Sequence, residues 1–147
     1  MFCQLDQVKQ VLDITSAVND ALRKKWDHPF DMAAYSLRAA TVIWGLLVLD
    51  DYDVFMKQGA GQYWVELYID GAIFIIMAIQ PEKPGQGLPD IVFIPGEDAL
   101  VECGLSGGAD YEWRRDDCEE YFWQAVLDIL NRDKNVCDIL DEIENSW

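Results

Sequence analysis

The single histidine, His28, is the first residue to consider for chemistry, because Ser/His/Asp sites, Cys/His sites and His-based metal sites all need an imidazole. It lies in the run Asp27-His28-Pro29-Phe30, and no nucleophile or second ligand stands at a recognisable spacing from it. Pro29 biases the residue before it away from helical geometry. We therefore expect His28 to lie in a turn between helices and to play no catalytic part.

A glycine-rich stretch, Gly104-Leu105-Ser106-Gly107-Gly108, matches the G-x-S-x-G pattern of a nucleophile elbow. That elbow requires a long α/β-hydrolase sheet and a histidine that follows the serine. No histidine follows Ser106, so the sequence favours a flexible glycine turn.

Three acids, Asp50, Asp51 and Asp53, follow an apolar segment, where carboxylates oppose the dipole of a helix C-terminus. Acids placed against that preference are candidates for a metal or partner site. Their spacing fails the calcium-loop pattern, since Phe55 occupies the fifth place and no glycine the sixth. We expect a solvated helix end. Phosphate-loop and dinucleotide motifs are also missing, so we predict no catalytic residue, no metal and no cofactor.

Acids alternate with aromatic residues between Asp110 and Glu120, just ahead of an expected helix. In one interpretation the rings dock on the core and the acids cap the helix. In the other, aromatic anchors ringed by carboxylates form a patch that suits a groove lined with Lys and Arg. The predicted partner-binding residues are Asp110, Tyr111, Glu112, Trp113, Asp116, Asp117, Glu119 and Glu120.

Two helices are predicted ahead of these motifs. Apolar residues at three- and four-residue steps from Leu5 to Trp26 predict an amphipathic helix. A second helix runs over Met32–Leu49, with Asp31 as its N-cap. Its 18 residues touch the lower limit for a membrane span, but Arg38 and Gly45 interrupt it and favour a core helix.

The clearest local signal is a hairpin formed by Tyr63–Ile69 and Ala72–Ile79 around Asp70-Gly71, a pair typical of a type I′ turn. A two-residue turn there would pair Ile69 with Ala72 and Leu67 with Phe74. The second run is apolar on both faces and predicts a central strand, whereas the run with Glu66 should lie nearer an edge. A loop is expected at residues 81–89, after the hairpin, followed by further strands at residues 90–94 and 99–103.

Helices close the chain. Asp116 or Asp117 is the expected N-cap of a helix that reaches Leu130, with Glu119 and Glu120 in capping-box register. A last helix carries an apolar face, Val136, Ile139, Leu140 and Ile143. The fold class is therefore α+β: two N-terminal helices, a small, mainly antiparallel sheet of three or four strands, and two C-terminal helices. We expect both helical pairs to cover the sheet, in a single globular domain over residues 1–147.

The charge balance sets this chain apart. Its 147 residues hold 27 acids against eleven Lys and Arg, a net charge of −16. Residues 95–147 hold fifteen acids and four bases, so −11 falls in the last third. Such a surface repels nucleic acid and anionic membranes and attracts basic proteins. Solubility alone explains a milder excess, but it does not require this concentration.

The four cysteines, Cys3, Cys103, Cys118 and Cys137, form no CxxC pair, and the first six residues lack the basic and apolar regions of a signal peptide. We expect a cytoplasmic protein with free thiols. The leading hypothesis is a small acidic inhibitor that neutralises a basic nucleic-acid-handling protein, as a toxin immunity protein or a nucleic-acid mimic does. A nuclease toxin is one candidate partner. Alternatives are an acidic secretion chaperone or adaptor that holds a client protein, and an enzyme that works with carboxylates alone.

Overall fold

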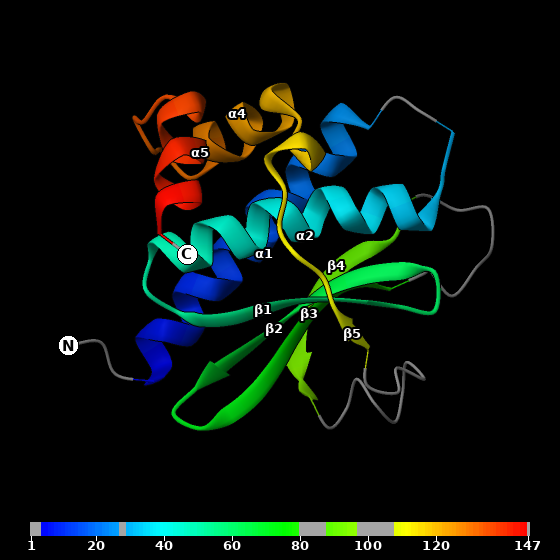
Figure 1. Ribbon diagram of the computed structural model, residues 1–147, viewed down its shortest axis with the longest axis vertical. Helices are drawn as coiled ribbons and strands as arrows, with labels where there is room; N and C mark the ends of the chain where they lie inside the picture. Colours follow the sequence, from blue (N-terminus) through cyan, green and yellow to red (C-terminus); the bar gives the residue numbers. More distant parts are fainter. Residues whose placement is uncertain (1–3, 27–28, 80–87, 97–107, 147) are drawn as a thin grey trace.

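A computed structural model describes residues 4–26, 29–79, 88–96 and 108–146, and within them the predicted α+β fold is confirmed (Figure 1). Its α-helices are α1 (Gln4–Lys25), α2 (Met32–Leu49), α4 (Glu120–Ile129) and α5 (Val136–Asn145). Its strands are β1 (Asp53–Gly59), β2 (Gln62–Ile69), β3 (Ala72–Ile79), β4 (Asp90–Pro95) and β5 (Ala109–Asp110). The expected fourth strand at 99–103, His28 and Ser106 lie outside the described residues.

The hairpin has the predicted register. Ile69 pairs with Ala72 and Leu67 with Phe74, while Asp70 and Gly71 take positive φ angles of 51° and 82°. These angles are those that a type I′ turn requires. The two runs therefore form one antiparallel pair with Asp70-Gly71 at its tip.

The sheet is a five-stranded antiparallel meander in the order β4-β3-β2-β1-β5. As predicted, β3 is flanked on both sides, by β2 and β4. The prediction that the Glu66 run lies nearer an edge is wrong. That run, β2, is the middle strand, because β1 pairs along its other side from Asp53 to Gly59.

No strand was predicted at β1. Its burial alternates, with Val54 and Met56 facing the core and Phe55 facing outward. A two-residue turn, Ala60-Gly61, joins β1 to β2, and both of its residues have positive φ angles, 52° and 77°. Alanine seldom adopts such a conformation, so this turn lacks the Asn-Gly or Asp-Gly signature that marks the next one.

The expected capping is also wrong. Asp116 and Asp117 belong to a short 3₁₀ turn, η1 (Arg115–Asp117), and do not cap α4. The N-cap position of α4 is Glu119, whose side chain makes no capping hydrogen bond. In contrast, Asp31 caps α2 as predicted, since its carboxylate accepts a hydrogen bond from the Ala33 amide at 3.1 Å.

The described elements stack in three layers (Figure 1). Helices α1 and α2 lie on one face of the sheet, with α2 against β1, β2 and β3 and α1 against β4. The main contacts of α4 are with α1 and α5, and those of α5 are with α2 and α4. We expected both helical pairs to cover the sheet, and for α4 and α5 this is wrong. Because α2 is apolar nearly all round, it packs on the sheet from one side and on α5 from the other.

This arrangement accounts for the apolar character of α2. By length and hydropathy the helix could cross a membrane, yet 61% of it is buried inside the protein. Its buried residues run from Tyr35 to Leu47. They join one hydrophobic cluster with buried side chains from α1, the inner face of the sheet, α4 and α5. Burial of this kind is typical of a core helix.

Candidate interaction surface

The predicted partner-binding segment, Asp110 to Glu120, runs from the edge of the sheet to the start of α4. Its first residue, Asp110, lies on β5 opposite Lys57 of β1. The Lys57 Nζ atom lies 2.5 Å from the Asp110 carboxylate, and the Asp110 side chain is 83% exposed. That hydrogen bond is the main cause that raises the pKa of Lys57. Asp110 therefore neutralises a base on the sheet while it stays open to solvent.

Tyr111 and Asp117 are held together within the segment. The Tyr111 amide donates to the Met56 carbonyl oxygen at 2.9 Å, and its hydroxyl donates to the Asp117 carboxylate at 2.6 Å. Its ring packs edge-on against Tyr63, with ring centroids 4.9 Å apart. Burial, and then the bond to Asp117, raise the pKa of Tyr111 to about 12. These contacts fix the path of the chain from β5 to η1.

Trp113 belongs to the core. It is 3% exposed, its indole N–H donates to the Thr41 carbonyl oxygen at 3.0 Å, and its ring stacks on Trp44 at 5.7 Å. A partner cannot reach this ring without unfolding the segment. For Trp113, the contacts favour the interpretation in which aromatic rings dock on the core.

The segment is tied to α5 through Arg115. Its guanidinium lies 2.5 Å from the Asp141 carboxylate and 2.7 Å from that of Glu144, and these two bonds raise the pKa of Arg115. Glu112 and Asp116, by contrast, are exposed and form no ion pair with another described residue. These two carboxylates are therefore available to a partner without loss of an internal contact.

Glu119 and Glu120 begin α4. The Glu119 carboxylate lies 3.7 Å from the Arg38 guanidinium of α2, and the Arg38 side chain is only 11% exposed. That guanidinium lies over two rings, 4.7 Å from the centroid of Trp26 and 5.6 Å from that of Tyr121. Glu120 is exposed and accepts only a long contact from the Cys137 thiol, at 3.8 Å.

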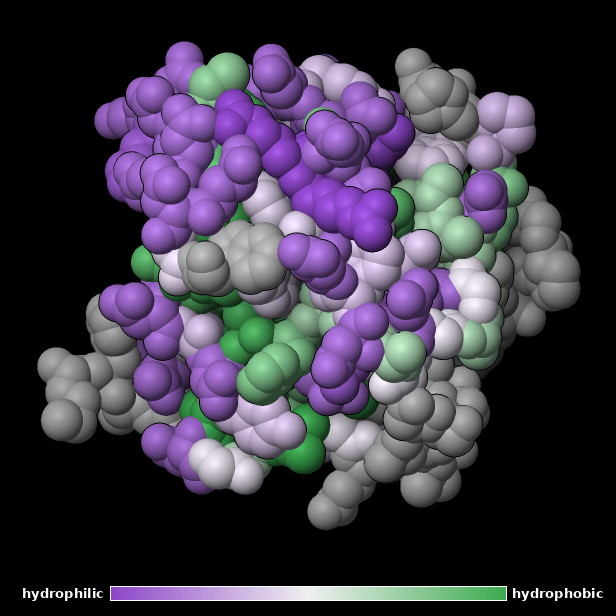
Figure 2. Space-filling view, viewed as in Figure 1, coloured by the Kyte–Doolittle hydropathy of each residue, from purple (hydrophilic) through white to green (hydrophobic). Residues whose placement is uncertain are grey.

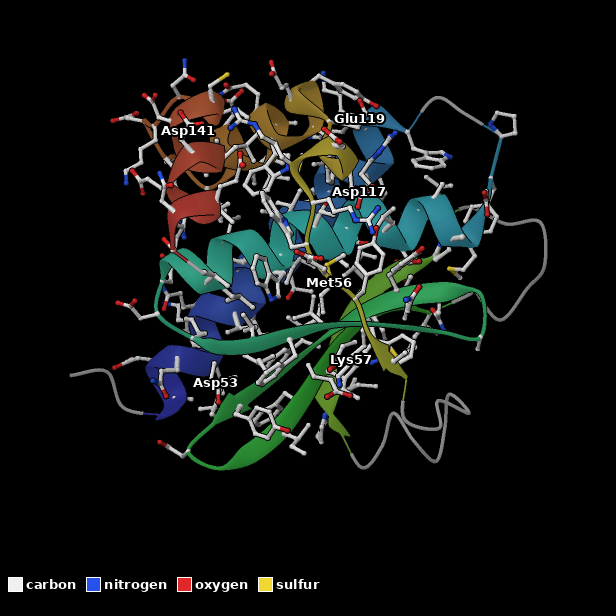
Figure 3. All side chains as sticks on the ribbon, in the orientation of Figure 1. Asp53, Met56, Lys57, Asp117, Glu119 and Asp141 are labelled. Atoms are coloured by element: carbon white, nitrogen blue, oxygen red, sulfur yellow. The ribbon has the colours of Figure 1, made fainter. Side chains whose placement is uncertain are left out.

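Apart from Asp110 on β5, the carboxylates of residues 108–146 gather in the layer of η1, α4 and α5. Figure 3 shows Asp117, Glu119 and Asp141 there, away from Asp53 and Lys57 on the sheet. Twelve acids and four bases fall in this range, eleven of the acids are exposed, and Asp117 is half-buried. Of the four bases, Arg115, Arg132 and Lys134 are already paired with acids. Figure 2 shows the resulting hydrophilic surface over α4 and α5.

The acidic run after α2 is not simply solvated, contrary to our expectation. Asp50 is the C-cap residue of α2, and its carboxylate accepts from Arg132 at 2.9 Å and from Gln10 at 3.3 Å. Its side chain is only 20% exposed. Asp50 thus ties the end of α2 to α1 and to the α4–α5 connection. The described residues contain no group of three or more His, Cys, Asp or Glu side chains that could hold a metal ion.

The hollows in the described part of the chain offer little for catalysis. One, between α4 and α5, is open and shallow and is lined by Glu120, Tyr121, Gln124, Asn135, Val136 and Cys137. Another lies beneath Ser36 and Tyr63 and has room for about one water molecule. Of the four cysteines, Cys118 and Cys137 carry free thiols as expected, and burial raises the pKa of the Cys118 thiol to about 12. Cys3 and Cys103 lie outside the described residues.

The outer face of the sheet, opposite α1 and α2, was not among the predicted binding surfaces. Phe55 and Ile73 are each 44% exposed on this face, and Tyr68 pairs with Ile73 while its ring contacts that of Phe55. The period-two alternation of β1 was the signal that could have revealed it. Comparison of the chain with protein-family models, with curated proteins and with solved structures finds no match.

Proposed function

We propose that this chain is a cytoplasmic inhibitor that binds a basic nucleic-acid-handling protein, for example a nuclease toxin, and occupies its phosphate-binding surface. The supporting observation is the acidic layer of η1, α4 and α5, in which ten carboxylates are exposed and three of four bases are already paired. A field of one sign speeds the encounter with an oppositely charged surface and orients the two proteins. The proposal includes no catalytic step.

The eight residues of the predicted partner-binding segment divide into two groups. Trp113 is buried, and Tyr111 and Asp117 are bonded to each other, so these three shape the segment. Asp110, Glu112, Asp116, Glu119 and Glu120 are exposed and carry the charge that a partner would meet. Carboxylates on a rim act mainly on association rate and salt sensitivity.

The direct test is inhibition. The purified chain is immobilised and used to capture proteins from an extract of its source cells at low and at high salt. Each captured protein is then assayed for nuclease or nucleic-acid-binding activity with and without the chain. We expect a basic protein that is retained at low salt and released at high salt. Its nuclease or nucleic-acid-binding activity should be lost when an equimolar amount of the chain is added. The proposal would be overturned if the amount of captured protein did not depend on salt, or if the chain did not reduce the activity of the captured protein.

A second candidate function is a secretion chaperone or adaptor that holds a client protein. It is favoured by two exposed leucines on α1, Leu5 at 75% and Leu12 at 46% exposure. A client held on apolar groups would be retained at high salt, since salt screens charges and does not weaken apolar burial. The same capture experiment therefore separates the two functions.

A further inference from the structure

The outer face of the sheet carries an exposed apolar patch. Phe55 of β1 and Tyr68 of β2 meet edge-on, with ring centroids 5.9 Å apart, and Tyr68 pairs with Ile73 of β3. Ile75 lies beside them and is buried in a small second cluster with Trp64 and Met77. Figure 2 shows hydrophobic side chains among the strands, whereas hydrophilic ones cover the layer of α4 and α5.

Asp53, exposed at the start of β1, pairs with Tyr68 on this face, and the other carboxylate in the patch is Glu66. The register pairs it with Phe55 on one side and with Ile75 on the other, and Tyr68 follows two residues later on the same face. Its side chain is half-buried. On this face of the described strands the only base is Lys57, which the Asp110 carboxylate already pairs with at 2.5 Å. The charge of Glu66 also acts on Lys57, but that ammonium is bonded to Asp110, and Glu66 forms no ion pair of its own with a described residue.

The chain uses the same combination of groups to hold its own Arg38. That guanidinium lies over the rings of Trp26 and Tyr121, and the Glu119 carboxylate lies 3.7 Å away. Aromatic faces attract a guanidinium through their quadrupole, and a carboxylate supplies the counter-charge. The outer face presents two rings and a carboxylate in the same way, but toward solvent.

We propose that Phe55, Glu66 and Tyr68 form a docking site for an arginine side chain of a basic partner protein. A second copy of the chain is the wrong occupant, because each copy carries a net charge of −16 and like fields repel. The apolar patch supplies the desolvated centre that an interface needs, and the acids of the η1, α4 and α5 layer supply long-range attraction. The proposal rests on the proposed function, from which it takes the basic character of the partner.

The test uses hexa-arginine as the probe and hexa-lysine as its equally charged comparison, titrated into the isotope-labelled chain. We expect hexa-arginine to shift the amide signals of β1 and β2 and to bind more tightly than hexa-lysine. Phe55→Leu keeps an apolar side chain but removes the ring, and Glu66→Gln removes the charge. Each should weaken hexa-arginine binding about two- to fivefold.

Control variants come from positions outside the patch. Phe30 has the same 44% exposure as Phe55, so Phe30→Leu is the control for the ring, and Asp138→Asn on α5 is the control for one lost charge. Equal effects from site and control variants, or signal shifts confined to α4 and α5, would overturn the site. Well-dispersed spectra confirm that each variant is folded.

The outcomes also separate this site from the proposed function. Docking as expected, together with a captured partner that handles no nucleic acid, would leave the site standing and remove the function. Inhibition of a basic nucleic-acid-handling protein that Glu66→Gln and Phe55→Leu leave unchanged would do the reverse.

Discussion

Gly45, in the middle of α2, lies against the ring of Trp123 in α4. A methyl group at position 45 would come within 2.8 Å of the Trp123 ring and within 2.8 Å of the Cδ1 atom of Ile143 in α5. Glycine is therefore what lets the C-terminal helices approach α2. We predict that Gly45→Ala lowers the free energy of unfolding by about 1–3 kcal/mol through overpacking, despite the better helix propensity of alanine. Chemical denaturation measures the change.

A second substitution tests the cause. Ile143→Val removes the Cδ1 atom that the new methyl group would meet, and each single variant should destabilise the protein. If overpacking is the cause, the double variant should lose less stability than the two single losses added together. Strictly additive losses would show that the contact between α2 and α5 is not the reason for the glycine.

The contacts of Trp113 predict a loss of stability when its indole nitrogen is removed. Trp113→Phe keeps an apolar ring but loses the donor to the Thr41 carbonyl oxygen, so we expect a cost of about 1–2 kcal/mol. Thermal melts measure the cost, and partner binding by the folded variant should be unchanged. Weaker binding without a lower melting temperature would mean that Trp113 meets the partner directly.

The raised pKa of Tyr111 predicts loss of stability in alkali. Its pKa rises from 10.0 to about 12 because burial, and then the hydrogen bond to Asp117, favour the neutral phenol. A phenol whose pKa is higher in the folded protein than in the unfolded chain contributes to the free energy of unfolding. That contribution is complete at pH values below the unfolded pKa, and it is lost as the pH rises through the folded pKa. Stability should therefore fall between pH 10 and about 12.

Urea denaturation between pH 10 and about 12 measures the free energy of unfolding, which should fall less steeply with pH in Tyr111→Phe than in the unmodified protein. Burial likewise raises the pKa of Tyr35 to about 12, so part of the slope will remain in that variant. Tyr68→Phe is the control, because the Tyr68 hydroxyl makes no hydrogen bond with another described residue. If Tyr111→Phe did not change how steeply the free energy of unfolding falls with pH, the raised pKa of Tyr111 would not be a cause of the alkaline loss of stability.

Local signals in the sequence were sufficient for the elements that carry them strongly. Asp70-Gly71 predicted both the turn and its register, and Asp31 predicted the start of α2. The element β1 was missed because its turn uses Ala60, whose positive φ angle has no signature in the sequence. Asp50, Asp51 and Asp53 were all attributed to a helix end, which is correct for Asp50 at the end of α2, but Asp53 is the first residue of β1.

The sequence was sufficient to predict the negative charge of the candidate surface, but not which of its side chains contact the rest of the protein. The acids of the last third are exposed as a group, but the part each one plays depends on long-range contacts. Asp117 is bonded to Tyr111, and Glu119 lies by Arg38, which is 81 positions earlier in the chain. Trp113 reaches back to Thr41 in the same way. The outer sheet face went unnoticed because Phe55 and Tyr68 belong to strands whose pairing the sequence analysis did not include.

The last prediction concerns where the charge acts. Glu112 and Asp116 lie in the segment, Asp13 and Asp20 lie on α1, and all four are exposed without an ion pair among the described residues. Reversing either pair to lysine changes the net charge of −16 by the same four units. If the acidic layer meets the basic partner, reversal of Glu112 and Asp116 should slow association about tenfold at low salt and flatten its salt dependence.

Reversal of Asp13 and Asp20 should do much less, because those charges lie on a helix outside the layer and are screened over about a Debye length of 10 Å. Stopped-flow association with the captured partner over a range of salt concentrations measures both variants, and thermal melts confirm that they fold. Equal slowing by the two pairs would mean that the total charge matters and its location does not. Association that neither pair alters, and that salt leaves unchanged, would favour a client held on apolar groups such as Leu5 and Leu12.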